Sequence, residues 1–136
     1  MADFLKILGT NNAVIGMVHL QALPGTPQSC NSVSQIVKRA VEEACRLADL
    51  GFDAVLVENM HDTPYLLREV GPEIVAAMTA ATSAVVEAVS LPVGVQVLAG
   101  ANTAALAIAH ASGGVFIRAE GFAFASIADE GFMDVA

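Results

Sequence analysis

Residues 54–59 have the sequence Ala-Val-Leu-Val-Glu-Asn, in which four apolar residues are followed at once by two polar ones. Three other short stretches repeat this pattern of an apolar run that stops at a polar residue. They are residues 14–18 before His19, residues 92–95 before Gln96, and residues 115–117 before Arg118. Apolar runs without polar–apolar alternation are typical of strands buried on both faces of a parallel sheet. We therefore predict four such strands, the first of them over residues 13–19.

The segments between these runs have the periodicity of amphipathic helices. Ser32 followed by Gln35 is a capping-box pattern at the start of the first helix, which we expect to end at Gly51. Pro72 suits the first position of a second helix. Asn102 is the expected N-cap of a third helix. The chain therefore alternates strands and helices in a β-α-β-α-β-α-β order.

This alternation indicates a parallel sheet with right-handed crossovers. A complete β/α barrel requires eight strand–helix units and about 250 residues, whereas this chain has 136 residues and supplies about four units. We predict an α/β fold in which residues 1–136 form a single partial domain, half of a parallel TIM-type β/α barrel, truncated at the C-terminus. A small open α/β sheet is the alternative. The tail, residues 126–136, is expected to be a loop and the beginning of a fourth helix.

Hydrophobic residues make up 55% of the chain and charged residues only 15%, so few residues remain to face water. The apolar stretch of residues 74–86 is shorter than the about 20 residues that a membrane-spanning helix needs, so we predict no membrane insertion. The excess of apolar residues favours a core-rich piece whose remaining polar surface is either missing or covered by a partner. We expect a homo-oligomer that forms through the exposed edges of the half barrel.

The formal net charge of −8 disfavours nucleic acid as a partner, because nucleic-acid binding needs basic patches. Cys30 and Cys45 are the only cysteines, and no disulfide is expected between them. The first residues lack the features of a signal peptide, so a cytoplasmic location is the default. The sequence contains neither a GxGxxG nor a GxxxxGK[ST] motif, and we predict no nucleotide cofactor.

The polar residues that follow the predicted strands are the candidate functional residues, because active sites of β/α barrels lie at the carboxyl ends of the strands. Strand residues alternate between faces, so these side chains converge if their face is the barrel interior. Glu58 is the first candidate for catalysis, since burial of a carboxylate suits it to proton transfer. His19 is the second, since imidazole titrates near neutral pH. The alternative is that each polar residue only marks where its strand leaves the core.

Five residues of this edge are candidates for substrate binding: Asn59, Asp62, Gln96, Arg118 and Glu120. The planar fork of Arg118 suits a phosphate or a carboxylate, and an internal salt bridge to Glu58 or Glu120 is the alternative role. Asp62 precedes a Thr-Pro pair and alternatively makes an Asx turn. A divalent cation would find four candidate ligands here, although their spacing matches no recognised metal motif: Glu58, Asp62, Glu120 and His19.

Several of these stretches, in this order along the chain, resemble the BtpA family, the photosystem I biogenesis protein family. The first comprises residues 15–20 and the Leu-Pro-Gly-Thr-Pro of 23–27, and the second comprises residues 57–59 and 62–65. The third is residues 92–98, and the match is completed by residues 104–109, 116–118 and 128–131. Together they cover nearly the whole chain, and their combination is specific.

The resemblance implies a β/α barrel of the phosphate-binding kind whose members are about twice as long as this chain. It implies that this chain is an N-terminal half, and it assigns no catalytic residues. We expect the complete protein to bind or convert a small phosphorylated metabolite, and whether it is an enzyme stays open. The alternatives are a non-catalytic assembly or stability factor, as the family name suggests, and an inactive truncated isoform.

Overall fold

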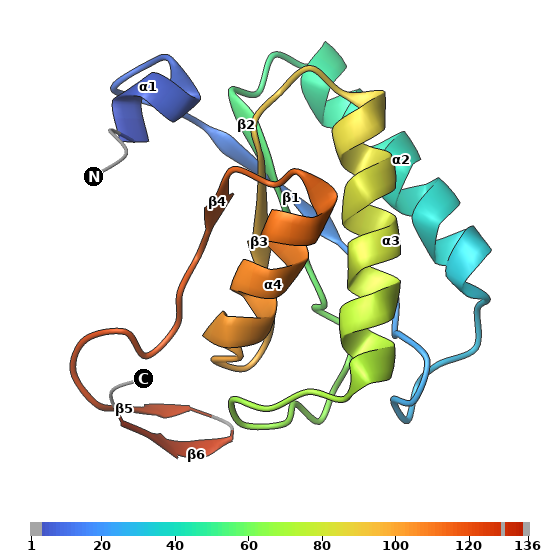
Figure 1. Cartoon of the computed structure of the whole chain (residues 1–136), viewed down its shortest axis with the longest axis vertical. Helices are drawn as coiled ribbons and strands as arrows, with labels where there is room; N and C mark the ends of the chain where they lie inside the picture. Colours follow the sequence, from blue (N-terminus) through green and yellow to red (C-terminus); the bar gives the residue numbers. More distant parts are fainter. Residues whose placement is uncertain (1–3, 129, 135–136) are drawn as a thin grey trace.

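The computed structural model describes residues 4–128 and 130–134, and its centre is a sheet of four parallel strands (Figure 1). The strands lie in the order β1 (Ile15–His19), β2 (Ala54–Glu58), β3 (Val93–Gln96) and β4 (Phe116–Ile117). They alternate with the helices α2 (Val33–Asp49), α3 (Pro72–Ala88) and α4 (Asn102–Ser112). The predicted alternation is confirmed, and β1 to β4 form one parallel sheet.

Local signals in the sequence account for most helix boundaries. Ser32 caps α2 with the predicted capping box, in which its side chain accepts a hydrogen bond from the Gln35 backbone N–H. Gly51 follows the helix in the left-handed region, at φ +83°, where only glycine is free of strain. The expected capping role of Asn102 is wrong, because α4 begins at this residue and its N-cap is Ala101. The Asn102 side chain instead bonds the backbone of Glu120.

The register of the sheet places three of the strand-end residues in one row. His19 of β1 pairs with Glu58 of β2, and Glu58 pairs in turn with Gln96 of β3. Arg118 directly follows β4, and its backbone N–H bonds the carbonyl of Val95 in β3. The carboxyl ends of all four strands therefore meet at the same edge of the sheet.

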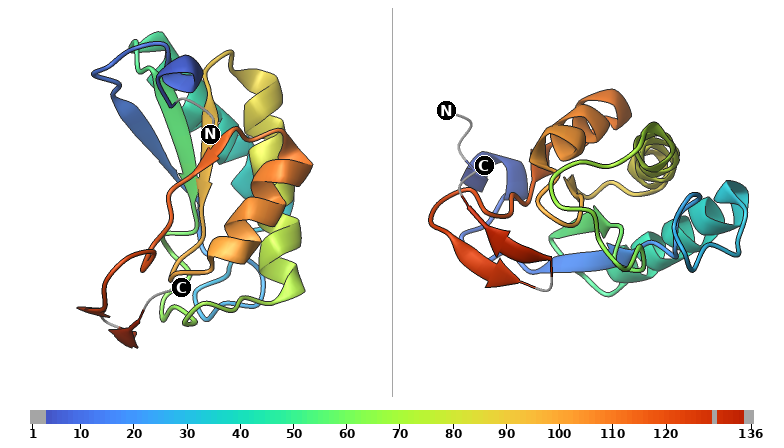
Figure 2. Two further views of the ribbon diagram at one scale, coloured as in Figure 1. Left: turned by 60° about the vertical axis from the view of Figure 1, so that its left-hand side comes forward. Right: turned by 90° about the horizontal axis from the view of Figure 1, so that it is seen from below.

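The helices α2, α3 and α4 lie along one side of the sheet (Figure 2). Val18, Val57 and Val95 belong to the core cluster that these helices complete. The alternate residues of each strand point to the other face. There the short helix α1 (Phe4–Leu8) places Phe4 edge-on against Phe116, with 5.9 Å between the ring centroids. Residues of β2 and β3 are buried on both faces as predicted, but those of the edge strand β1 are buried only alternately.

The tail differs from the prediction of a loop and a helix. It forms an antiparallel hairpin of β5 (Ser126–Ala128) and β6 (Gly131–Met133), which lies on the side of the sheet opposite α2–α4 (Figure 2). Gly131 adopts φ +102°, a conformation that suits a turn rather than a helix. Met133 is buried against Gly100, so this contact fastens the hairpin near the strand ends. Residue 129 and residues 135–136 of the predicted tail, like residues 1–3, lie outside the described residues.

A glycine in β3 makes room for the aromatic contact on the face opposite the helices. Gly94 pairs with Phe116, and a Cβ at Gly94 would overlap the Phe116 ring. We expect Gly94→Ala to lower the free energy of unfolding by about 1–3 kcal/mol through overpacking. Urea denaturation followed by circular dichroism measures this loss.

The double variant Gly94→Ala/Phe116→Leu is the matched test of that cause. Shortening the ring should relieve the overlap, so the double variant should lose less stability than the two single losses added together. Strict additivity would contradict an overlap between the two side chains.

Candidate functional site

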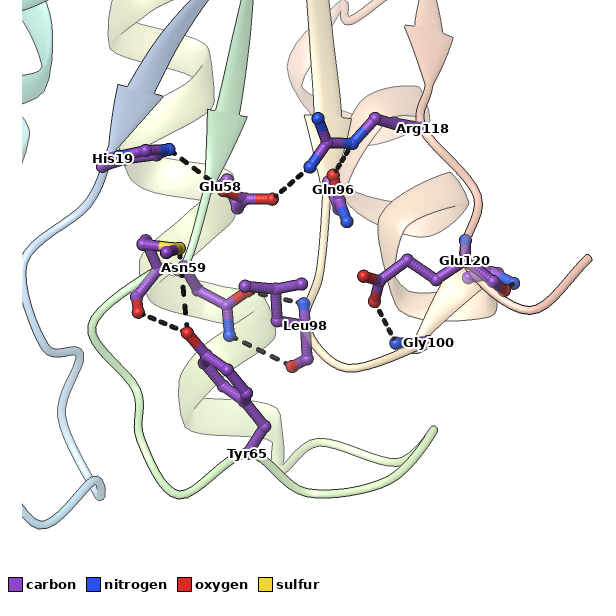
Figure 3. Close-up of polar contacts among 11 residues, drawn as sticks. His19, Glu58, Asn59, Tyr65, Gln96, Leu98, Gly100, Arg118 and Glu120 are labelled. Atoms are coloured by element: carbon purple, nitrogen blue, oxygen red, sulfur yellow. Dashed lines mark hydrogen bonds and ion pairs between the residues drawn. The ribbon is translucent and has the colours of Figure 1, made fainter. Parts of the chain in front are cut away.

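The carboxylate of Glu58 is the centre of a row of contacting side chains at the carboxyl edge of the sheet (Figure 3). Its Oε2 lies 3.1 Å from Nε2 of His19, and its Oε1 accepts a hydrogen bond of 2.9 Å from Nη2 of Arg118. Arg118 also donates through Nε to Oε1 of Gln96. The structure thus brings together four residues that lie far apart in the sequence.

Burial within this row falls from the central strands to the edges. Glu58 is 3% exposed and Gln96 is 1% exposed. By contrast, the His19 side chain is 39% exposed and that of Arg118 is 55% exposed. A buried carboxylate is costly unless it is paired, and the two partners of Glu58 supply that pairing. The salt bridge to Arg118 that we considered as an alternative role is therefore present.

Some polar groups of the same row are still able to contact a ligand. Two contacts occupy only part of the five-donor guanidinium of Arg118, so further donors remain for an anion. The imidazole of His19 is partly exposed beside a carboxylate, an arrangement that can accept and donate protons. Nε2 of the buried Gln96 has no hydrogen-bond partner among the described residues. The row can therefore hold a polar ligand and exchange protons with it.

An open cleft of about 390 Å³ lies over this row. Its wall includes His19, Glu58 and Arg118 from the strand ends and Glu130 from the hairpin. Tyr65 also lines it, and its hydroxyl donates a 2.6 Å hydrogen bond to the carbonyl of Met60. We did not predict Tyr65 as a site residue. It is the only tyrosine in the chain, and it lies in one of the stretches that carry the family resemblance.

The side chains of Asn59 and Asp62 connect the loops after β1, β2 and β3 through hydrogen bonds. Asp62 Oδ1 accepts a 2.8 Å hydrogen bond from the backbone N–H of Leu23, and Oδ2 accepts one of 2.9 Å from Asn59. Asn59 Oδ1 in turn accepts from the N–H of Leu98 at 2.7 Å. The hydrogen bond of Asp62 thus reaches across to the loop after β1, in place of the Asx turn that we considered. Both residues line a second, smaller cleft of about 200 Å³.

Glu120 is held by the loop that precedes α4. Its Oε2 accepts a 2.7 Å hydrogen bond from the N–H of Gly100. The side chain of Asn102 donates to the Glu120 carbonyl at 2.8 Å and accepts from the Glu120 N–H at 3.1 Å. These three bonds join the segment after β4 to the segment after β3. Glu120 lines the 390 Å³ cleft while its carboxylate serves this connection.

The four candidate cation ligands are not grouped into a metal site in the described part of the chain. Across residues 4–128 and 130–134, no group of three or more His, Cys, Asp and Glu side chains is placed to hold a metal ion. Glu58 contacts His19, whereas Asp62 and Glu120 are committed to backbone N–H groups of other loops. In the same part of the chain, no helix has the length and apolar character required to cross a membrane.

Replacing the buried carboxylate of Asp62 should destabilise the fold. Burial raises the pKa of Asp62, and its hydrogen bonds from Leu23 and Asn59 partly offset that effect. Asp62→Ala leaves the buried N–H of Leu23 without its acceptor, so we expect a loss of about 1–3 kcal/mol in the free energy of unfolding. Asp53→Ala is the matched control, because Asp53 accepts an equal 2.8 Å bond from the Val14 N–H at an exposed position. Equal losses in urea denaturation would contradict this role of burial.

The pKa of Tyr65, the single tyrosine, depends on the negative charge in the cleft. Burial raises the pKa of Tyr65 above its ordinary value of 10.0, and the negative charge of Glu58 raises it further. We expect Glu58→Gln to lower the Tyr65 pKa in an absorbance titration of tyrosinate, with circular dichroism as the check that the fold persists. Glu42→Gln, on the exposed side of α2, should leave the titration unchanged. An identical shift in both variants would contradict a local effect.

Comparison with known proteins places this chain in a family of mostly uncharacterised members. An uncharacterised mitochondrial protein of Caenorhabditis elegans is 42% identical over 135 positions, covering 95% of this chain and 49% of that protein. An uncharacterised protein of Archaeoglobus fulgidus is 41% identical over 121 positions, covering 89% of this chain and 48% of that protein. The photosystem I biogenesis protein BtpA of Synechocystis is 36% identical over 132 positions, covering 97% of this chain and 46% of that protein.

The chain spans about half the length of these curated relatives. No solved structure gives a significant match to it. The model of the BtpA family matches residues 10–136, which is nearly the whole chain. The strand-end row and the loops that support it all lie within this match, and the chain belongs to the BtpA family.

Proposed function

We propose that the row of His19, Glu58, Gln96 and Arg118 is part of a binding site for a small phosphorylated metabolite. The observation that supports this proposal is the buried Glu58 carboxylate, which lies between the imidazole of His19 and the guanidinium of Arg118 beneath an open cleft. Glu58 and His19 can bind and deprotonate a hydroxyl group. The remaining donors of Arg118 suit a phosphate or carboxylate oxygen. A ligand that carries both kinds of group, such as a phosphorylated polyol, fits this combination.

In this proposal the complete protein is a parallel β/α barrel, and this chain supplies its first four strands as one partial domain. Support comes from the parallel order β1-β2-β3-β4, the helices on one side, and the polar residues at the carboxyl ends. The other part of the longer relatives would add strands and a phosphate-binding side. Asn59, Asp62 and Glu120 then act on the ligand indirectly, because they hold the loops that shape the site.

The alternative function is a non-catalytic role in assembling or stabilising other proteins. It is favoured by the name of the Synechocystis relative, a photosystem I biogenesis protein. A surface that recognises a protein partner would not need a buried carboxylate beneath a cleft. We therefore place the metabolite site first. A cytoplasmic location remains a prediction.

The test is a thermal-shift screen of sugar phosphates, with the unphosphorylated sugars and inorganic phosphate as comparisons. It uses this chain and the full-length Archaeoglobus relative in parallel. A phosphorylated sugar should raise the midpoint of unfolding, and titration calorimetry should give its affinity. In this chain, Glu58→Gln and Arg118→Lys should each weaken binding at least about tenfold, because one removes the carboxylate and the other the planar fork.

The matched control is Arg39→Lys, which changes an exposed arginine on α2 away from the cleft. It should bind like the unchanged chain. If neither protein responds to any phosphate ester in a broad library, the metabolite proposal is wrong and the assembly role becomes the better account.

A further inference from the structure

We propose that the 200 Å³ cleft beside Tyr65 is a second binding site, for a small molecule that joins an apolar body to a protonated amine. Tyr65 and Leu98 line both this cleft and the 390 Å³ cleft. The other walls are the loop after β1, the loop after β2 and the start of α3. No residue of the strand-end row lines the smaller cleft, so this site goes beyond the proposed metabolite site and does not rest on it.

Most of the wall of this cleft is apolar. Besides Tyr65 and Leu98, it includes Pro27, Pro64, Leu66, Val70 and Ile74. Clefts with apolar walls and a few converging polar groups are the usual binding sites of small molecules in proteins. Burial of an apolar body against this wall would supply the attraction between ligand and protein.

Hydrogen bonds of buried side chains fix the loops that form the cleft. Asp62 is 6% exposed and binds the loop after β1 through the N–H of Leu23. Asn59 is 1% exposed and holds Leu98 of the loop after β3, beside Tyr65 (Figure 3). These loops follow three strands that are paired with one another. A ligand would therefore meet a preformed wall and lose little affinity to ordering it.

The charge of the cleft selects a cation. The carboxyl groups of Asp62 and Glu73 line it, whereas no Lys, Arg or His is among its described lining residues. Both Asp62 oxygens already accept a hydrogen bond. The Glu73 carboxylate has no ion-pair partner among the described residues, so it can accept hydrogen bonds from an ammonium group. An anion would be repelled by the same two groups.

Two glycines leave room for the Glu73 side chain at the rim of the cleft. A Cβ at Gly25, in the loop after β1, would lie 3.0 Å from Cγ of Glu73. A Cβ at Gly71, the N-cap of α3, would overlap its carboxylate. Glu73 therefore lies between the loop after β1 and the start of α3. Its alternative role is to stabilise α3 alone, because a negative charge is favourable at a helix N-terminus.

Fluorescence of the single tyrosine measures occupation of the cleft, since the chain contains no tryptophan. The probe is cyclohexylmethylamine, and cyclohexylmethanol and cyclohexanecarboxylate are its neutral and anionic counterparts with the same ring. At pH 7 and constant ionic strength, we expect the amine to change Tyr65 emission saturably, with a dissociation constant of about 1 mM or below. The alcohol and the carboxylate should each bind at least about tenfold more weakly, because neither makes a charge-assisted hydrogen bond to Glu73.

Substitutions at the rim test the role of the carboxylate. Glu73→Gln should remove the preference for the amine over the alcohol and leave the affinity for the alcohol unchanged. Glu87→Gln is the matched control, because Glu87 is an exposed glutamate at the other end of α3, and it should keep the preference. Leu66→Ala, at an exposed apolar wall residue, should weaken the amine and the alcohol by a similar factor. Circular dichroism checks that each variant is folded.

Four outcomes would overturn this site. They are no saturable response to the amine up to about 10 mM, tenfold above the expected constant, equal affinity for all three probes, an equal loss of preference in Glu87→Gln, and retention of the preference in Glu73→Gln. The third would mean that the net charge of −8 attracts the amine without a site. The fourth would mean that Glu73 serves only the helix.

The amine site and the metabolite site can fail separately. Arg118→Lys, which should weaken a phosphorylated ligand, should leave the affinity for the amine unchanged because Arg118 does not line the smaller cleft. An equal loss of amine binding in Arg118→Lys would place the amine in the larger cleft and overturn the assignment.

Discussion

The candidate site depends on the register in which β1, β2 and β3 pair. Parallel pairing aligns His19, Glu58 and Gln96 across three strands, and a shift of one residue would turn a side chain to the opposite face. The valines packed against α2–α4 oppose such a shift, because it would expose them. The hydrophobic core on one face of the sheet therefore decides the position of the polar row on the other.

Glu58 connects the stability of the fold with the chemistry of the site. It lies on a strand whose residues are all buried, where an unpaired carboxylate would carry a large desolvation penalty. His19 and Arg118 remove much of that penalty, and both remain accessible from the cleft. Glu58 can therefore form an internal ion pair and also take part in binding a ligand. The pairing holds the carboxylate in place, and the exposed partners offer contacts to a ligand.

The sequence predicted the sheet, the helices and the strand-end residues better than it predicted the loops. Asn102 precedes a helical stretch and looks like a cap, yet its side chain holds Glu120. Asp62 looks like a turn residue, yet it accepts a hydrogen bond from Leu23, 39 residues away. These side chains bond segments that are distant along the chain, so no local pattern reveals their partners. The hairpin of the tail was missed because its strands are only three residues long.

By itself the sequence determined the alternation of strands and helices, the capping of α2 and the polar residue at the carboxyl end of each parallel strand. These features depend on local backbone preferences and on the period of apolar residues, both of which are visible in one chain. Only the tertiary structure decided that Glu58 contacts both His19 and Arg118, and that Tyr65 joins the cleft. Those outcomes depend on which strands become neighbours, and the side chains of each strand meet their partners only when the sheet has formed.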